Sequence, residues 1–517
     1  MAYYESYSIM TGSGRNAHCL GVRVPPEWPF QSVLIANRGE IALRIVRTVQ
    51  RLGLRAVVVH HAVDANAPAV RHADLAVEIH GATPVAAYLD GPQIIEAALA
   101  AGAGAVHPGY GFLSENAGFA RACRDAGLIF VGPTPEVIER MGDKVTARSF
   151  VAHAGFPVAP SAIEDDDPAT FVERARHVGA PLLIKPAAGG GGKGMRIVRD
   201  LAALASEIER ARSEGQRYFG DGRLYAERFV ENPRHIEVQV LGDAHGNVVH
   251  LHERECSVQR RFQKIVEETP SPALTPELRR DICTVAAGIA RNAGYSGAGT
   301  VEFVFGGGTF YFLEMNTRLQ VEHPVTEVVF GIDLVEQQLR VAAGEPLGFS
   351  QDELQPRGHA IELRIYAEDA ASGYLPTTGT ILTLQEPNGP GVRVDSGIST
   401  GQDVTAAFDP MLAKLIVHAP TRDDAIALGR RSLHDYVLLG CKTNIGFLRR
   451  LLAHPAFAEG EIHTGFLDAH PEVAAEPAIG PALLHKLLAV AALTSRPLRD
   501  AADAVPALHA AIGAWRN

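Results

Sequence analysis

The sequence predicts an α/β protein whose first domain is a parallel sheet covered by helices. Two observations predict this class. Buried strand patterns at residues 32–36 and 56–60 flank apolar residues that recur at helical spacing, namely Ile41, Ile45, Val46, Val49 and Leu52. The alternation then continues through residues 94–98, 105–107, 119–126 and 128–131. Alternating strands and helices of this kind favour a Rossmann-like domain, and 517 residues leave room for about two more domains.

The turn after the first strand argues against a dinucleotide site. It reads Asn37-Arg38-Gly39-Glu40, without the G-x-G-x-x-G pattern that brings backbone amides close to a pyrophosphate. A nicotinamide cofactor is therefore not expected. The spacing of Asn37 and Glu40 instead indicates a capping box at the start of the following helix.

A glycine run marks the second part of the chain. Residues 182–185 and 195–198 read as strands on either side of glycines 189–192, and an amphipathic helix pattern follows at 201–212. Glycine lets backbone amides approach phosphate oxygens, and Lys185 and Lys193 add positive charge there. Because Lys193 is followed by Gly194 rather than Ser or Thr, the run is not a Walker A loop. We expect a hairpin lid over a nucleotide; a flexible linker is the alternative.

The strongest local signal is a hairpin with acidic and amide side chains. Strands at residues 301–305 and 309–313 flank a turn of three glycines. If Phe305 lies opposite Thr309, then Glu302 lies opposite Phe312, and period-2 alternation puts Glu314 and Asn316 on the face of Glu302. Such oxygen ligands suit Mg²⁺ at a nucleotide site.

The same alternation extends beyond the hairpin and adds more polar residues to that face. It continues through Arg318, Gln320 and Glu322. A solvated strand face is the structural alternative, but it gives no reason to mix amides with paired opposite charges beside a phosphate-binding candidate.

Composition limits the classes of partner. A formal net charge of −11 supplies no general counter-charge for nucleic acid or an anionic membrane, so neither partner is expected. The five cysteines show neither paired nor metal-ligand spacing, which fits a reducing compartment. The N-terminus lacks a signal-peptide pattern and no apolar run approaches the roughly 20 residues of a membrane span. We expect a cytoplasmic protein.

Several segments, in order, match one family, and together they span residues 32 to about 467. They are IANRGEIALRI, HPGYGFLSEN, MGDK, GGGGKGM, NPRHIEVQV, ERECSVQRRFQK, EMNTRLQVEHPVTE and GHAIELRIYAED. With these segments the chain resembles biotin carboxylases, which are ATP-grasp enzymes and components of acyl-CoA carboxylases.

The resemblance implies a role for each matching residue. The expected ATP contacts are Lys144, Lys185, Gly190, Gly191, Gly192, Glu227, His235 and Gln259, with the backbone at 227–230 contacting adenine. The expected ligands for Mg²⁺ or Mn²⁺ are Glu302, Glu314 and Asn316. Bicarbonate would be held by Lys264, Arg318, Gln320 and the backbone of Val321, with Glu322 as its general base. Arg364 would stabilise the biotin enolate, and Tyr110 would contact the ureido ring.

Without the resemblance, some of these residues have ordinary structural explanations. Arg364 could form a strand salt bridge with Glu362 or Glu368. His235 could be a satisfied structural histidine. Lys144 is, by position, a surface lysine near a helix end.

The resemblance also implies the domain plan. It comprises a disordered leader (1–31), a Rossmann-like N-terminal domain (32–141), an ATP-grasp domain (142–358) with a mobile glycine-rich lid at about 157–230, a strand-rich C-terminal domain (359–468), and a linker with a helical tail (469–517). Within this plan, the strand-rich pattern ends near 417 and a helical pattern covers 425–439. The tail has a helical stretch at 482–505.

The expected reaction is the ATP- and bicarbonate-dependent carboxylation of biotin on a carrier, the first half-reaction of an acetyl- or propionyl-CoA type carboxylase in fatty acid biosynthesis. None of the six methionines is followed by lysine, so an Ala-Met-Lys-Met-like attachment site is missing from this sequence. The expected biotin carboxyl carrier is therefore supplied in trans. The resemblance implies two further partners, a second copy of the chain to form a homodimer and a carboxyltransferase subunit. The tail either docks on its own domain or meets one of the partner polypeptides.

Alternative functions remain open at this point. A pyruvate or urea carboxylase would use the same component. Another ATP-grasp ligase, joining a carboxylate to an amine, would share the nucleotide and metal residues without needing Arg318, Gln320, Glu322 or Arg364. A non-enzymatic regulator should have lost a metal ligand or the base. Two residues depart from the family pattern: Phe262 replaces a common His or Asn, and Ala188 replaces a Gly of the run.

Overall fold

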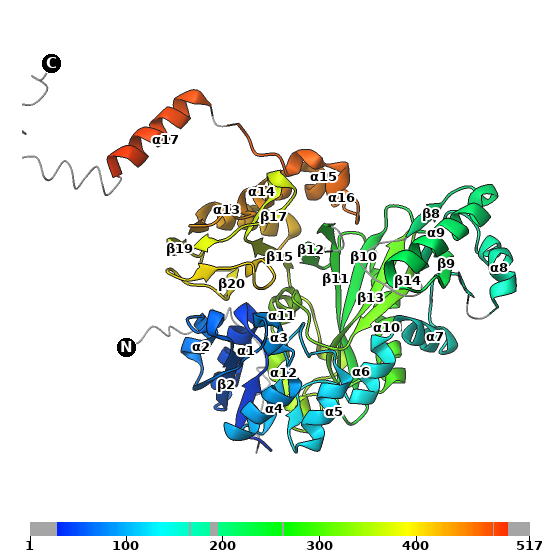
Figure 1. Ribbon diagram of the computed structural model, residues 1–517, viewed down its shortest axis with the longest axis horizontal. Helices are drawn as coiled ribbons and strands as arrows, with labels where there is room; N and C mark the ends of the chain where they lie inside the picture. Colours follow the sequence, from blue (N-terminus) through cyan, green and yellow to red (C-terminus); the bar gives the residue numbers. More distant parts are fainter. Residues whose placement is uncertain (1–27, 165–166, 187–194, 261–262, 479, 495–517) are drawn as a thin grey trace, which may run out of the picture.

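The computed structural model describes residues 28–164, 167–186, 195–260, 263–478 and 480–494. The first domain is a five-stranded parallel sheet in the order β3-β2-β1-β4-β5 (Figure 1). Its strands are β1 (Ser32–Ile35), β2 (Arg55–His60), β3 (Leu75–Glu78), β4 (Ala105–His107) and β5 (Ile129–Phe130). Its helices are α1 (Gly39–Arg51), α2 (Pro68–His72), α3 (Pro84–Tyr88), α4 (Gly91–Ala100), α5 (Ala117–Asp125) and α6 (Pro135–Gly142). The Rossmann-like prediction is confirmed.

The capping box expected at the start of α1 is wrong. The N-cap is Arg38, and its side chain makes no capping hydrogen bond. Asn37 instead donates from Nδ2 to the carbonyl oxygens of Pro108 and Tyr110, at 2.7 Å each. Glu40 is buried and faces the third domain. The two polar side chains thus join segments distant in sequence, which local spacing could not reveal.

An eight-stranded antiparallel sheet forms the centre of the molecule, in the order β14-β13-β10-β11-β12-β15-β22-β20. Its first five strands are β10 (Arg234–Gly242), β11 (Val248–Arg260), β12 (Gln263–Thr269), β13 (Gly297–Gly306) and β14 (Thr309–Asn316). The others are β15 (His359–Tyr366), β20 (Val392–Ser396) and β22 (Met411–Ala419). One sheet therefore runs through both the central and the C-terminal parts of the chain.

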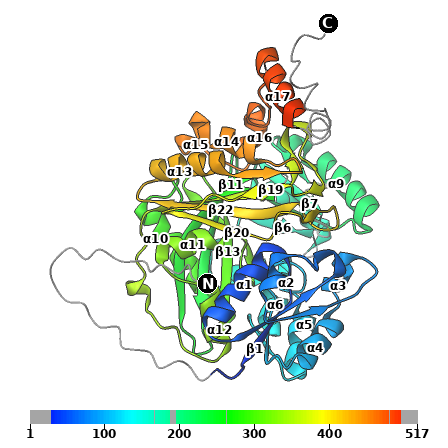
Figure 2. The ribbon, with the colours of Figure 1, turned by 90° about the vertical axis from the view of Figure 1, so that its left-hand side faces the viewer.

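Helices close the faces of this sheet. They include α7 (Lys144–His153), α10 (Pro276–Ala293), α11 (His323–Phe330) and α12 (Leu334–Ala342). The Thr275 side chain caps α10 by accepting from the amide of Leu278, and Gly294 ends the helix in the left-handed conformation, with φ at 65°. In Figure 2, α1 lies beside β20 and β22, so the first domain packs on the third.

The lid is a separate four-stranded sheet in the order β6-β9-β7-β8, with its own apolar core. It comprises β6 (Ser161–Ile163), β7 (Leu182–Pro186), β8 (Arg196–Val198) and β9 (Leu224–Arg228), together with α8 (Phe171–Val178) and α9 (Leu204–Phe219). Strands β7 and β8 pair antiparallel, as expected for a hairpin. Residues 187–194, including the predicted ATP contacts Gly190, Gly191 and Gly192, lie outside the described residues, as does Phe262.

Short strands and helices complete the C-terminal part. The strands are β16 (Glu368–Asp369), β17 (Leu375–Pro376), β18 (Gly379–Thr380), β19 (Thr383–Gln385), β21 (Asp403–Val404) and β23 (Val437–Leu439). The helices are α13 (Arg422–Asp435), α14 (Ile445–Ala453), α15 (Pro455–Ala458) and α16 (Phe466–Ala469). The helical prediction for 425–439 is wrong at its end, because residues from 437 onward pair with β19.

The tail forms α17 (Pro481–Thr494), which stands away from the rest of the molecule in Figure 1. Its large apolar side chains are exposed; Leu483 and Leu488, for example, are 53% and 58% exposed. The described part of the tail is therefore not docked on its own domain. None of the described helices combines the length and apolar character that crossing a bilayer requires.

Candidate active site

Lys264 lies at the centre of the site, among three buried carboxylates. Its Nζ donates to Glu237 at 2.6 Å, to Glu302 at 2.9 Å and to Glu322 at 2.7 Å. The three acids come from β10, β13 and the residue before α11. Burial opposes the ammonium, but the three carboxylates outweigh it and raise the pKa of Lys264 well above its ordinary value. The lysine therefore stays charged at neutral pH.

The predicted metal ligands do converge, although through a different register. Phe305 lies opposite Phe310, and a bulge between Glu302 and Phe303 then places Glu302 directly opposite Glu314. The predicted pairing of Glu302 with Phe312 is wrong. Asn316 donates from Nδ2 to Glu302 at 2.8 Å, so all three side chains share one face. This donor set of two carboxylates and an amide fits a divalent ion of the Mg²⁺ class.

The segment after β14 leaves the sheet, so Arg318, Gln320 and Glu322 do not continue an extended strand. Arg318 nevertheless donates from Nη1 to Gln320 Oε1 at 2.9 Å and from Nε to Glu115 at 3.0 Å. Gln320 is 4% exposed, and its Nε2 lacks a hydrogen-bond partner among the described residues. A solvated strand face is therefore excluded. An unpaired buried donor beside Arg318 suits an anionic ligand.

Glu322 lies between two cations. Besides Lys264, it accepts from Arg364 Nη2 at 3.0 Å. Burial alone would raise the pKa of Glu322, but Lys264, Arg364 and Arg254 together hold it well below its usual range. The carboxylate is therefore ionised and able to accept a proton. Arg364 also donates from Nε to Glu267 at 2.6 Å, so neither Glu362 nor Glu368 is the partner that the ordinary explanation named.

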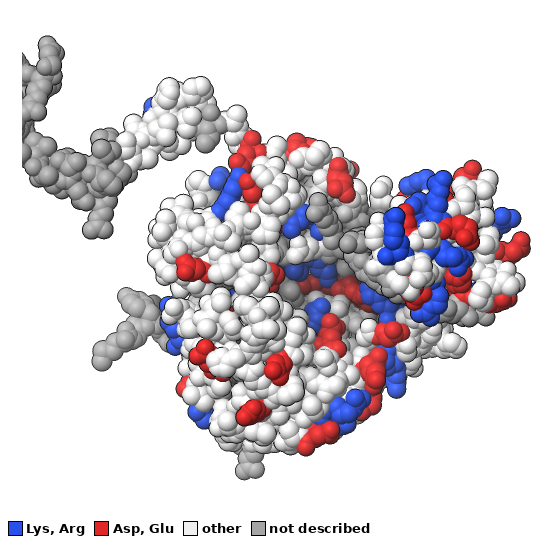
Figure 3. Space-filling model, viewed as in Figure 1, with Lys and Arg blue, Asp and Glu red and all other residues white. Residues whose placement is uncertain are grey.

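The predicted nucleotide residues border this cluster. Lys144, the first residue of α7, pairs with Glu314 at 2.8 Å, and its side chain is 78% exposed. His235 Nε2 lies 2.8 Å from Glu302. Burial lowers the pKa of His235, yet the Glu302 carboxylate outweighs this effect, and the net pKa is raised. Figure 3 shows a hollow between the lid and the body with charged residues on its floor.

Three other predicted nucleotide residues lie on strands. Lys185 on β7 forms an ion pair with Glu227 on β9, and its Nζ lies 3.1 Å from the Tyr225 hydroxyl. Gln259 on β11 lies directly opposite Lys264. The lid strands β7 and β9 thus contribute Lys185 and Glu227, and the central sheet contributes Gln259.

Comparison with known proteins covers most of the chain. Residues 29–138 match the family model of the biotin carboxylase N-terminal domain, and 362–469 match that of the biotin carboxylase C-terminal domain. Residues 143–350 match the ATP-binding domain of the carbamoyl-phosphate synthase L chain. The biotin carboxylase of Halalkalibacterium halodurans is 51% identical over 449 residues, which cover 86% of this chain and 98% of that protein. The chain belongs to the biotin carboxylase family.

Other relatives support membership of the same family. A pyruvate carboxylase subunit of Methanothermobacter thermautotrophicus is 47% identical over 85% of this chain and 90% of that protein. The biotin carboxylase domain of the Hydrogenobacter thermophilus 2-oxoglutarate carboxylase superposes with a TM-score of 0.81 at 44% identity, over 87% of this chain and 99% of that one. This biotin carboxylase is an ATP-dependent ligase that carboxylates biotin with bicarbonate.

The biotin carboxylase site includes residues that the sequence analysis did not select. Glu237 and Arg254 are fully buried, and Arg254 donates to Glu237 at 2.5 Å. Glu267 is also fully buried, and it is held by Arg364. A signal was available for Glu237, because His235, Glu237 and Gln239 alternate with apolar residues along one strand. A polar face on a central strand indicates a buried polar network.

Tyr110 and Val321 both connect to Lys414, another residue that was missed. The Tyr110 hydroxyl donates to Glu40, whose other oxygen lies 3.3 Å from Lys414 Nζ. Lys414 also donates to the carbonyl of Val321 at 2.7 Å. Burial raises the pKa of Glu40 to about 7, with Lys414 partly opposing it. Lys414 thus joins the first domain, through Glu40, to Val321, the residue before Glu322.

Proposed function

We propose that this chain performs the first half-reaction of an acyl-CoA carboxylase, with bicarbonate activated by Glu322 and biotin presented by a carrier in trans. The position of Glu322 between Lys264 and Arg364 carries the proposal. An ionised carboxylate beside two cations is the arrangement needed to deprotonate a bound anion while its charge is held.

In this mechanism Lys264, Arg318, Gln320 and the Val321 backbone bind bicarbonate. Bound bicarbonate competes with Glu322 for the nearby cations, which raises the basicity of the carboxylate. Glu322 takes the bicarbonate proton as an oxygen of bicarbonate attacks the γ-phosphorus and ADP leaves. The resulting carboxyphosphate decomposes to CO₂ and phosphate, and the phosphate removes the biotin ureido proton before biotin attacks CO₂.

The nucleotide is assigned to the hollow under the lid. Its proposed contacts are Lys144, Lys185, Gly190, Gly191, Gly192, Glu227, His235 and Gln259. Glu302, Glu314 and Asn316 would hold Mg²⁺ or Mn²⁺, which shields phosphate charge when bound. The Hydrogenobacter relative was crystallised as a dimer with MgADP, ADP and bicarbonate, which supports this set of ligands and a homodimer here.

Arg364 is assigned to the biotin enolate. Arg364 is 7% exposed and its guanidinium is oriented by Glu267, so it can donate to a developing ureido oxygen without a large reorganisation. Tyr110 is assigned to the ureido ring.

The parent enzyme is proposed to be of the acetyl- or propionyl-CoA type. Pyruvate, 2-oxoglutarate and urea systems are the alternatives, since relatives include a 2-oxoglutarate carboxylase domain and part of a pyruvate carboxylase. The domain boundaries given above remain predictions.

The first test is the dependence of ATP cleavage on its substrates. The purified chain should release phosphate only when bicarbonate and Mg²⁺ or Mn²⁺ are present, and free biotin should stimulate release. A coupled assay for ADP with each component omitted in turn measures this. Equal turnover with and without biotin and bicarbonate would favour another ATP-grasp ligase, and no turnover at all would favour a nucleotide-binding regulator.

The second test concerns the carrier. Because no methionine in the sequence precedes a lysine, the purified chain should give no signal on a streptavidin blot. It should instead transfer ¹⁴C from bicarbonate to a separately supplied biotinylated carrier domain. Mass spectrometry that found covalent biotin on this chain would contradict the trans arrangement.

A further inference from the structure

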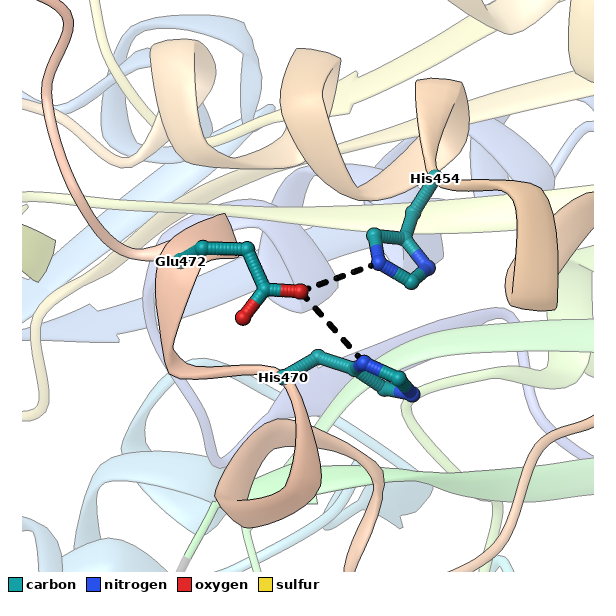
Figure 4. Close-up of side chains that lie close together, drawn as sticks. All are labelled: His454, His470 and Glu472. Carbon is teal, nitrogen blue, oxygen red and sulfur yellow. Dashed lines mark hydrogen bonds and ion pairs between the residues drawn. The ribbon is translucent and has the colours of Figure 1, made fainter.

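A second cluster of metal-type ligands lies at the end of the C-terminal domain, formed by His454, His470 and Glu472 (Figure 4). One carboxylate oxygen, Glu472 Oε1, lies 3.1 Å from His454 Nε2 and 3.4 Å from His470 Nδ1. The three ligand atoms all lie within 4.8 Å of one another. The cluster shares no residue with the proposed active site.

We propose that His454, His470 and Glu472 form a binding site for a transition-metal ion of the Zn²⁺ class. Zn²⁺ binds nitrogen and carboxylate oxygen at about 2.0–2.2 Å with tetrahedral geometry, which puts its ligand atoms roughly 3.3–3.5 Å apart. The separations of 3.1 Å and 3.4 Å are close to this edge length. Two imidazoles and one carboxylate also form a ligand set that Zn²⁺ prefers over Mg²⁺.

The surroundings already hold both rings in place. His454, between α14 and α15, lies edge-on to Phe466 with ring centroids 5.7 Å apart, and Phe466 is fully buried. The His470 ring lies 4.7 Å from Phe466 and 4.3 Å from His454. His454 Nδ1 is buried without a hydrogen-bond partner among the described residues. Nε2, which faces Glu472, is therefore the nitrogen that His454 offers to a ligand.

The backbone that carries Glu472 is also fixed. Glu472 lies in a short 3-10 turn, Pro471–Val473, directly after His470. Arg450 on α14 donates from Nε to the Val473 carbonyl at 2.8 Å, which ties this turn to the helix. A metal ion would therefore need to order little of this backbone when it binds. Glu472, with its side chain 59% exposed, leaves the site open to water as a fourth ligand.

A metal at this site would cross-link α14 to the start of the tail. His454 follows α14, whereas His470 and Glu472 immediately precede the segment that leads to α17. Bound Zn²⁺ would therefore stabilise the folded C-terminal domain and fix the origin of the exposed helix. This consequence does not depend on the carboxylation mechanism.

Zn²⁺ binding by the whole chain tests the proposal. Chelator-treated protein, saturated with MgADP, is titrated with Zn²⁺ in competition with a chromophoric chelator, and thermal unfolding is followed in parallel. The wild type should bind one Zn²⁺ that a His454→Gln/His470→Gln double variant does not bind, and Glu472→Gln should weaken that binding at least about tenfold. Zn²⁺ should raise the unfolding midpoint of the wild type only.

His485→Gln is the matched control, because it removes an exposed histidine of α17 outside the cluster. This variant should bind Zn²⁺ as the wild type does. Biotin-dependent ATP cleavage without Zn²⁺ should be unchanged in all variants, which shows that each is folded. Other acid and thiol groups, including Glu237, Cys256 and Glu322, are retained in the double variant. Equal Zn²⁺ stoichiometry in the wild type and the double variant would therefore overturn the proposal, as would a wild type that cannot compete with the chelator.

Discussion

Glu322→Gln should lower the rate of biotin-dependent ATP cleavage by about 10²- to 10⁴-fold, the usual contribution of a general base. The amide keeps the shape of the side chain but cannot accept the bicarbonate proton. The proposed ATP contacts are on other residues, so the dissociation constant for MgATP should change little. Steady-state phosphate release and equilibrium nucleotide binding measure the two quantities separately.

Glu362→Gln is the matched control for this variant. Glu362 is also fully buried, and neither of its carboxylate oxygens has a hydrogen-bond partner among the described residues. Burial raises its pKa well above the ordinary value, which favours the uncharged acid, and an amide has nearly the same shape as that acid. This variant should retain most of the activity. A Glu322→Gln enzyme as active as Glu362→Gln would remove Glu322 from the mechanism.

Lys264→Met should abolish measurable carboxylation and also destabilise the protein. The ammonium is the shared partner of Glu237, Glu302 and Glu322, so its removal leaves three buried carboxylates close together with less compensating charge. Breaking a buried ion pair by removing one partner costs about 3–5 kcal/mol. We therefore expect a clearly lower thermal unfolding midpoint, together with the loss of bicarbonate-dependent ATP cleavage.

The control for this variant is Lys442→Met. Lys442 pairs with Asp369 at 2.9 Å and with Glu476 at 3.0 Å, but its side chain is 41% exposed. Ion pairs at exposed positions contribute little to stability because water and salt screen them, so this variant should keep the wild-type rate and nearly the wild-type midpoint. If Lys264→Met behaved like Lys442→Met, Lys264 could not be the charge that holds the cluster together.

Local sequence patterns were sufficient to predict much of the fold and the face that carries the metal ligands. Period-2 alternation was sufficient to place Glu302, Glu314 and Asn316 on one face, because a hairpin brings residues close in sequence into contact. Alternation could not give the register, because the bulge beside Glu302 shifts the pairing of the two strands. The pattern of residue types does not show where such a bulge occurs. The parallel first sheet was predictable for a similar reason, as its strands and helices each carry their own periodicity.

The sequence by itself thus determined the fold class, the lid hairpin and the family, and through the family the residues to consider. Only the tertiary structure decided that Lys264 lies among Glu237, Glu302 and Glu322, and that Arg364 pairs with Glu267 and Glu322. These contacts join strands and helix ends separated by tens of residues, where no periodicity links one position to another. The order of strands in the central sheet brings these side chains together, and each buried charge there requires an opposite charge beside it.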